Sequence, residues 1–346
     1  MAAAPSRIAM VARVRKPRTL AQWTLDAGLQ LEGAGGLRRL GREAVRAARK
    51  VQLRLHDPLV TYRIGQVALR LPLSHQLPYY RRRFPQYSSS IGRIGATVQH
   101  KYPNLSLIDI GANVGDTVAI IRHDAHYPIL CVEGSMAILP LLHSNVDPLG
   151  DVEIEAAFVG GTSGPVAASL RIADGTAHLA VGGPDQRALL LWSLDEIILR
   201  HPKFDSAKLV KSDTDGMDCQ IIAGAVDYLA RARPALFFEY DPDLTARAGA
   251  TAIRVFDVLE VTGYRYALVY DNTGDLMLLL DLRDRRLVSD LDAYFCGRNG
   301  FRYADICAFH ATDSDLALSL HKTELEFFRA LRGNGRASSV RTATLA

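Results

Sequence analysis

A glycine-rich turn at residues 109–117 (DIGANVGDT) is the segment of this chain best suited to chemistry, since it follows a short apolar run and precedes a helical pattern. Glycines at such a turn let the backbone approach a ligand, and the first N–H groups of a helix can donate to it. The Gly-x-Asn-x-Gly spacing lacks the second glycine that a dinucleotide pyrophosphate needs, and no lysine is present for a P-loop. Asp109 would repel a phosphate but suits an ammonium group such as that of methionine. The turn therefore favours a sulfonium nucleoside over a dinucleotide, although an ordinary strand-to-helix turn is the plain alternative.

Glu133 ends the next apolar run, 24 residues after Asp109. A carboxylate at the end of the second strand can accept hydrogen bonds from both hydroxyls of a ribose. Neighbouring parallel strands would bring it close to the glycine turn, although a surface glutamate at a strand end is also common. The expected cofactor-binding residues are Asp109, Gly111, Ala112, Asn113, Gly115, Asp116, Thr117, Glu133 and Gly134.

A second cluster of ionisable residues lies at 211–218 (KSDTDGMD), where another strand passes into a helix. Open parallel sheets bind ligands at the carboxyl ends of their strands. A calcium loop is excluded, because aligning Gly216 with the loop glycine places Lys211 and Ile222 at the first and last ligand positions. Helix capping is the other plain interpretation. We expect the catalytic residues here and at the end of the following strand: Lys211, Asp213, Asp215 and Glu239.

Short apolar runs that alternate with helical patterns must position these residues. We expect strands at 106–110, 128–134, 151–161, 207–213 and 234–242, an inserted hairpin turning at Asp174-Gly175, and a last hairpin within 264–281. A dinucleotide fold would continue with parallel units instead of ending in a hairpin. The order predicts an α/β fold with a doubly wound, mostly parallel seven-stranded sheet and an antiparallel edge hairpin.

The termini differ from this central domain, which we place at residues 105–312. Residues 1–70 are expected to form a basic helical extension, because the first 55 residues hold twelve Lys or Arg and three acids. One predicted helical face there carries Leu37, Leu40, Val45, Ala48, Val51 and Leu55. Such a helix could contact a membrane surface or an acidic partner, or simply pack on its own domain. Residues 313–346 are expected to form a helix and a flexible tail.

Residues 71–104 are expected to form a lid or cap. Prolines 72, 78 and 85 predict an ordered loop rather than long regular elements. Aromatic side chains in this stretch could close over a cofactor, stack on a substrate or pack against the sheet. The expected substrate-binding residues are Tyr79, Tyr80 and Tyr87.

Five motifs in this order resemble the FkbM-type methyltransferases: LIDIGANVGDT, CVEGS with HSNV, LWSLDEI, KSDTDGMDCQIIAGA, and ARPALFFEYDP. The resemblance runs from about Leu71 to Asp241, and nothing in residues 1–60 matches. It implies a class I methyltransferase fold, S-adenosylmethionine as methyl donor, and methylation of a hydroxyl oxygen, typically on sugars of surface glycans or secondary metabolites. The family pattern most often has glutamate where Asp215 stands, and Asp218 replaces another acid, so the acceptor preference can differ.

The resemblance leads us to expect an O-methyltransferase that acts on a sugar hydroxyl, in which Asp213 is the base or orients it while Lys211 and Asp215 position the acceptor. Magnesium ligation by Asp213, Asp215 and Asp218 is possible but not favoured, since helical direction points Asp218 away from the other two. No metal site is therefore assigned. The alternatives are a non-catalytic binding or assembly protein on the same fold and an RNA methyltransferase.

Bulk properties fit a soluble enzyme of the cytoplasm. Apolar residues make up 48% of the chain and charged residues 23%, no apolar stretch approaches the ~20 residues that cross a bilayer, and the four cysteines lack metal-ligand spacing. The net charge of +4 comes from the N-terminal segment, so a nucleic-acid partner is not favoured. A homodimer and a peripheral membrane contact by the basic N-terminus are possible.

Overall fold

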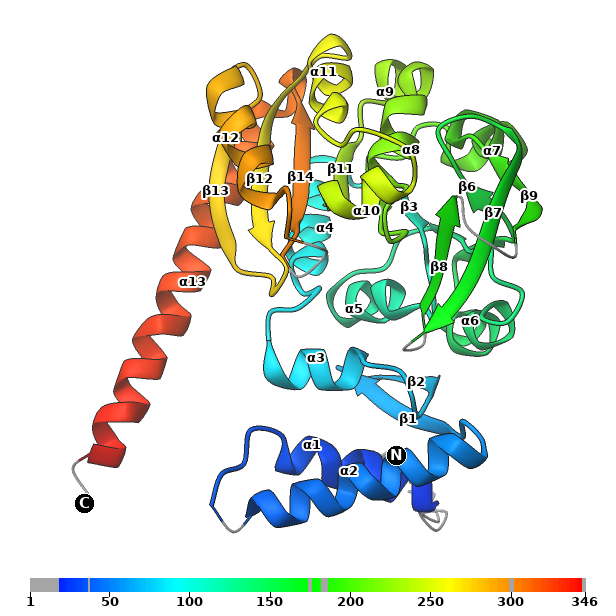
Figure 1. Ribbon diagram of the computed structural model, residues 1–346. Coiled ribbons are helices and arrows are strands. Elements are labelled where there is room, and N and C mark those ends of the chain that lie inside the picture. Colours follow the sequence, from blue (N-terminus) through cyan, green and yellow to red (C-terminus); the bar gives the residue numbers. More distant parts are fainter. Residues whose placement is uncertain (1–18, 37, 174–175, 182–185, 299–301, 344–346) are drawn as a thin grey trace, which may run out of the picture.

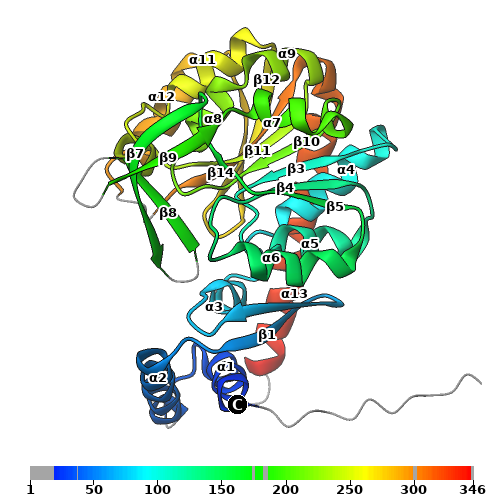
Figure 2. The same ribbon diagram turned by 90° about the vertical axis from the view of Figure 1, so that its right-hand side faces the viewer.

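An eight-stranded sheet forms the centre of the protein, between two layers of helices (Figures 1 and 2). The computed structural model describes residues 19–36, 38–173, 176–181, 186–298 and 302–343. The strand order is β13-β12-β14-β11-β10-β3-β4-β5. The strands are β3 (Leu107–Ile110), β4 (Ile129–Val132), β5 (Val152–Glu155), β10 (Leu209–Ser212), β11 (Ala235–Tyr240), β12 (Tyr264–Asp271), β13 (Leu276–Asp281) and β14 (Ala304–His310).

The pairing confirms a doubly wound, mostly parallel sheet that ends in an antiparallel hairpin. Strands from β5 to β11 pair in parallel, whereas β14 is antiparallel to both β11 and β12. A last antiparallel strand inserted between the fifth and sixth strands is the order of the class I methyltransferase fold. The predicted count of seven strands is corrected to eight, because β13 extends the sheet beyond β12.

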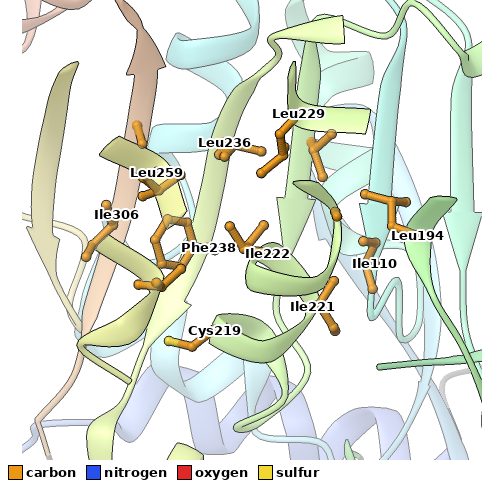
Figure 3. Packing of buried hydrophobic residues seen from close by; sticks show 14 of the residues in the cluster. Ile110, Leu194, Cys219, Ile221, Ile222, Leu229, Leu236, Phe238, Leu259 and Ile306 are labelled. Atoms are coloured by element: carbon orange, nitrogen blue, oxygen red, sulfur yellow. The ribbon is translucent and has the colours of Figure 1, made fainter. Parts of the chain in front are cut away.

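Apolar side chains cover both faces of the sheet, which explains the near-continuous apolar strands. Leu107 belongs to one buried cluster and Ile108 to the other, because successive side chains of a strand point to opposite faces. The first face is covered by α4 (Ser90–Lys101), α5 (Asp116–Asp124), α6 (Leu139–Val146) and α13 (Ser314–Ala343). The second is covered by α7 (Leu194–Arg200), α8 (Asp218–Gly224), α9 (Val226–Ala232), α11 (Arg254–Val261) and α12 (Arg285–Phe295). Figure 3 shows part of this second layer, where Ile222 and Leu259 lie near Phe238.

A four-stranded sheet is inserted between β5 and α7. It consists of β6 (Phe158–Val159), β7 (Gly164–Ala173), β8 (Thr176–Val181) and β9 (Arg187–Trp192) in the order β6-β9-β7-β8. The expected hairpin is confirmed by the β7–β8 pairing, although its turn at 174–175 lies outside the described residues. The single strand expected at 151–161 is wrong, because the chain leaves the main sheet after Glu155 and joins the inserted sheet at Phe158.

The N-terminal extension is helical only in its first part. Helices α1 (Leu20–Leu31) and α2 (Arg38–Leu55) are followed by a hairpin of β1 (Leu59–Ile64) and β2 (Val67–Pro72). A helical assignment up to residue 70 is therefore wrong for the hairpin, whose alternating buried residues have the period of a strand, as at Val60 and Ile64. Residues 1–18 lie outside the described part of the chain.

Helix α2 packs through only part of the face that its apolar pattern predicts, and most of that face is exposed. Leu40, Val51 and Leu55 are exposed, whereas Val45 and Gln52 are buried. Gln52 Nε2 donates to Thr24 Oγ1 at 2.7 Å, so a polar contact joins α2 to α1. Contact of this helix with a membrane surface or an acidic partner stays a prediction. Of the helices in the described ranges, none has the length and apolar character needed to cross a bilayer.

The segment at 71–104 contains two helices where prolines predicted a loop. Helix α3 (Leu77–Arg83) begins with Pro78 in its first turn, where the missing N–H of proline costs no helical hydrogen bond. The chain after α3 packs against the tip of the β12–β13 hairpin. A Cβ on Gly274 would lie 2.2 Å from the carbonyl oxygen of Gln86, so only glycine allows this approach.

The C-terminal helix α13 is joined to α4 by a buried ion pair. Arg93 Nε and Nη2 donate to the two carboxylate oxygens of Glu324 at 2.5 and 2.9 Å, and Glu324 is fully buried. The helix continues to Ala343, so it takes up most of the segment in which a flexible tail was also expected, and its last turns project away from the sheet (Figure 1). Residues 344–346 of the predicted tail lie outside the described residues.

Replacing Glu324 with Gln should lower the free energy of unfolding by about 3 kcal/mol, because it leaves the Arg93 charge without its buried partner. The matched control is Asp205→Asn, which breaks an exposed pair with Arg231 and should cost less than about 1 kcal/mol. Urea denaturation of both variants measures the difference. Equal losses would show that Glu324 does not fasten α13 to the domain.

Candidate active site

A cavity of about 840 Å³ opens at the edge of the sheet where β3, β4, β10 and β11 end. Both predicted clusters line it, as expected from strands that run in parallel. The predicted residues on its wall are Tyr80, Tyr87, Gly111, Asn113, Asp116, Glu133, Gly134, Lys211, Asp213, Asp215 and Glu239.

Some residues of the glycine turn line the cavity, and others pack against neighbouring segments of the chain. Gly111 has a φ of 75°, and a Cβ there would lie 2.0 Å from the carbonyl oxygen of Asp213. Gly115 caps α5 with a φ of 84° and lies against Val146. Ala112, Gly115 and Thr117 are buried and do not line the cavity, so their predicted contact with a cofactor stays a prediction.

Asp109 is fully buried and does not line the cavity in this structure, so its contact with a ligand ammonium stays a prediction. The chain itself supplies the cation. Asp109 pairs in register with Lys211 on the next strand, and its Oδ1 lies 3.2 Å from the Lys211 Nζ. Burial raises the pKa of the Asp109 carboxyl, and the nearby ammonium opposes that rise. The role of Asp109 is therefore to hold Lys211.

Lys211 links the buried carboxylate to the cavity. Its ammonium also lies 3.4 Å from Asp213 Oδ2, and the Asp213 side chain is half exposed. Burial by itself would lower the pKa of Lys211, but the carboxylates of Asp109 and Asp213 more than offset it and hold the pKa well above its usual value. Lys211 is thus a permanent cation that fixes Asp213 at the cavity wall.

Glu133 presents a carboxylate that is held rigidly by the backbone. Its Oε2 accepts from the Asn113 N–H at 3.0 Å and its Oε1 accepts from the Ser135 N–H at 2.7 Å. Each oxygen keeps a further lone pair for a ligand hydroxyl. Burial raises the pKa of Glu133, while these backbone hydrogen bonds oppose the rise.

An apolar slot adjoins Glu133. A Cβ on Gly134 would lie 2.2 Å from the ring of Phe158, so the absence of a side chain at 134 makes room for that ring. Phe158 lines the cavity together with Ile138, Ala157 and Val159. A planar aromatic group can stack in such a slot beside a carboxylate that binds hydroxyls.

The opposite end of the cavity is acidic. Asp215 sits in the left-handed region with a φ of 56°, and burial, followed by the charge of Asp213, raises its pKa to about 8. Glu239 lies directly opposite Asp305 in the antiparallel β11–β14 pair. Burial raises the pKa of both carboxyls well above the usual value. This end of the cavity therefore offers the Asp215 and Glu239 carboxyls, whose pKa values lie above the usual range, and Asp305 is not itself on the cavity wall.

Asp218 holds the turn between β10 and α8. It is buried, and its Oδ1 accepts from Ser212 Oγ at 2.6 Å and from the Thr214 N–H at 3.0 Å. This agrees with the expectation that it points away from Asp213 and Asp215. In the described ranges, no group of three or more His, Cys, Asp or Glu residues is placed to hold a metal ion.

The three predicted tyrosines separate into two groups. Tyr80 and Tyr87 line the cavity with ring centroids 5.3 Å apart. Tyr79 turns the other way, towards α1 and α2, and the Arg49 guanidinium lies 5.0 Å from its ring centroid. Tyr79 does not line this cavity, because adjacent residues of α3 point in directions about 100° apart, and its expected role in substrate binding stays a prediction.

Several cavity residues were missed by sequence reasoning. Phe158 looked like an ordinary strand residue, and Arg83 like part of the proline-rich loop expected at residues 71–104. Asp241 could have been found, since it follows Glu239 in one of the recognised motifs. The other missed residues on the wall include Asp271, Asn272, Thr273, Tyr294, Arg302 and Tyr303.

Comparison with known proteins finds no matching family model and no match among proteins of curated function. Among solved structures, methyltransferase FkbM from Methylobacillus flagellatus KT is 12% identical with a TM-score of 0.33, and the alignment covers 55% of this chain and 54% of that one. An O-methyltransferase from Bacillus cereus in complex with SAH is 11% identical with a TM-score of 0.37, covering 64% and 81%. A precorrin-6y C5,15-methyltransferase from Geobacter metallireducens GS-15 is 14% identical with a TM-score of 0.31, covering 62% and 86%.

The chain thus spans about half the length of the first of these structures. TM-scores below 0.5 are too low to support a conclusion about this chain, so its function has to be argued from the cavity.

The Asp109–Lys211 pair should show strong energetic coupling. Asp109→Asn and Lys211→Met each leave a buried group without its partner and should each cost about 3–5 kcal/mol of unfolding free energy. The double variant should lose clearly less than the sum of the two single losses. Urea denaturation of the three variants gives the coupling energy, and purely additive losses would contradict the pairing.

Proposed function

We propose that this protein is an S-adenosylmethionine-dependent methyltransferase that methylates a hydroxyl group of a sugar. The observation that carries the proposal is the Glu133 carboxylate, fixed by two backbone amides at the cavity wall beside the Phe158 slot. A nucleoside needs both features, a pair of acceptors for its ribose and a flat apolar slot for its base.

The remaining wall fits the rest of that cofactor. Asn113 lines the cavity, and its buried Oδ1 has no hydrogen-bond partner within the described structure, which leaves an acceptor for a donor group of a ligand. The cavity volume of about 840 Å³ accommodates a cofactor and a second substrate. Gly111, Asn113, Glu133, Gly134 and Phe158 would hold the nucleoside.

The bound cofactor would supply an electrophilic methyl group on a sulfonium sulfur. The chain must orient a hydroxyl oxygen and remove its proton. We assign Asp213 as the base that accepts the proton of the hydroxyl group, because its half-exposed carboxylate faces the cavity and Lys211 fixes it. Lys211 is a positioning residue, since its ammonium is committed to Asp109 and Asp213.

Asp215 has a different part in this proposal. With a pKa of about 8 it is mostly protonated at pH 7, so it can donate a hydrogen bond to the acceptor. The two neighbouring aspartates thus have different roles: Asp213 accepts the proton of the hydroxyl group, and Asp215 orients the substrate.

The acidic end of the cavity supports a sugar over RNA as acceptor. Carboxyl groups such as Glu239 and Asp241 pair well with sugar hydroxyls, and Tyr80 and Tyr87 offer faces on which a sugar ring can stack. The phosphodiester backbone of RNA is bound by basic residues, which this acidic end of the cavity does not provide. A non-catalytic binding protein would keep the nucleoside slot but would not need this pair of aspartates.

Calorimetry with S-adenosylhomocysteine tests the cofactor assignment. Native protein should bind, and Glu133→Ala should weaken binding by about tenfold or more, because two hydrogen bonds to a charged acceptor are lost. The matched control is Glu155→Ala on the neighbouring strand, a glutamate without a place on the cavity wall, which should bind like native protein. No binding by folded native protein would refute the proposal.

Methyl transfer to a panel of sugars tests the two aspartates. Asp213→Asn should lower turnover by about 10²- to 10⁴-fold, since no base remains. Asp215→Asn should keep most activity, because an amide also donates a hydrogen bond. Native activity should fall as pH rises through about 8 and Asp215 loses its proton, whereas Asp215→Asn should not show this fall. The opposite pattern, an active Asp213→Asn and an inactive Asp215→Asn, would exchange the two roles.

A further inference from the structure

A second, smaller cavity lies beside the first, between α1, α2 and α3. Its volume is about 210 Å³. Three residues, Gln76, Tyr80 and Arg83, line both cavities, so the two adjoin at α3. The other residues on its wall are Gly28, Glu32, Arg42, Val45, Arg46, Arg49 and Tyr79.

The wall of the small cavity is strongly basic. Four arginines face it, and Glu32 is its one acid. Arg42 and Arg46 share the carboxylate of Glu43, at 3.4 and 3.3 Å, and the Glu43 side chain is half exposed. One solvent-exposed carboxylate cannot neutralise two guanidinium groups, because water screens the contacts.

The other two arginines have no carboxylate partner in the described ranges of the chain. Arg49 donates to the carbonyl oxygens of Leu73 and Ser74 at 2.9 Å, which satisfies hydrogen bonds without neutralising its charge. Arg83, at the junction with the large cavity, lies over the ring of Phe84. Guanidinium groups gathered without counter-charges favour the binding of an anion.

Tyr79 adds a neutral donor to this wall. A Cβ on Gly28 would lie 2.5 Å from the Tyr79 hydroxyl, so glycine in α1 is what lets the hydroxyl fit here. Burial raises the pKa of Tyr79, and Arg49 opposes the rise. The hydroxyl therefore keeps its proton and can donate a hydrogen bond.

We infer that this arginine cavity binds a phosphate group carried by the methyl acceptor. Guanidinium groups from two helices, α2 and α3, line this cavity, and several donors suit a tetrahedral anion with several free oxygens. Because Tyr80 and Arg83 line both cavities, we place the phosphate in the small cavity and the rest of the same molecule in the large one. The acceptor is then a phosphorylated sugar, with its hydroxyls at the carboxyl groups and its phosphate at the arginines. This inference rests on the proposed function for the identity of the acceptor.

Calorimetric titration with inorganic phosphate and with glucose 1-phosphate tests the site. Both should bind to native protein. Arg46→Gln and Arg83→Gln should each weaken binding by about tenfold, as expected for one charged hydrogen bond. The matched control is Arg54→Gln, an exposed arginine of α2 that does not line the cavity and should leave binding unchanged. Arg49 is not suitable, because it also holds the chain at 73–74. Thermal denaturation confirms that each variant is folded.

The binding measurements test this inference and the proposed function separately. Absence of phosphate binding, or equal binding by Arg46→Gln, Arg83→Gln and native protein, would overturn the arginine site. Binding of S-adenosylhomocysteine on the same samples judges the methyltransferase proposal independently. Vesicles containing phosphatidic acid separate a lipid headgroup from a soluble ester. Because the arginines line a cavity that adjoins the large one, we expect glucose 1-phosphate to bind and the vesicles not to, and binding to vesicles alone would overturn the assignment.

Discussion

A buried ammonium group between two neighbouring strands sets the geometry of the whole cavity. Lys211 lies in register with Asp109 and extends to Asp213, so one cation ties the ends of β3 and β10 together. A lysine this deeply buried needs carboxylate partners to stay charged, and breaking one contact leaves an uncompensated charge. The close approach of the ends of β3 and β10 also requires glycine at position 111, because a Cβ there would collide with the backbone of Asp213.

The strand order then assigns different chemistry to the two sides of this pair. Towards β4 lie the held carboxylate of Glu133 and the slot at Phe158, which suit a nucleoside. Towards β11 and β14 lie carboxyl groups whose pKa values are raised by burial, as at Glu239 and Asp305, and which suit hydroxyl groups. The α3 segment and the β12–β13 tip cover that side, in contact at Gln86 and Gly274. Methyl transfer needs this arrangement, with two substrates meeting at one fixed charged group.

The sequence predicted the sheet and most of the charged residues on the cavity wall, because apolar strands followed by glycine or acidic residues are a local signal. Features that depend on contacts between segments far apart in the sequence were predicted less well. Asp109 was expected to bind a ligand ammonium, since the register that gives it Lys211 is not visible in the sequence. Phe158 and Asp305 were missed for the same reason. Pro78 was taken to break a helix that it in fact begins, and the apolar face of α2 proved exposed because Gln52 pairs with Thr24 instead.

A crystal structure of the protein grown with S-adenosylhomocysteine would test the central claim most directly. The account predicts a nucleoside in the large cavity, with its ribose hydroxyls on the Glu133 carboxylate, its base against Phe158, and its sulfur directed towards Asp213. The Lys211–Asp109 contact should stay intact beneath it. A cofactor bound elsewhere, or one that displaces Lys211 from Asp109, would contradict the account.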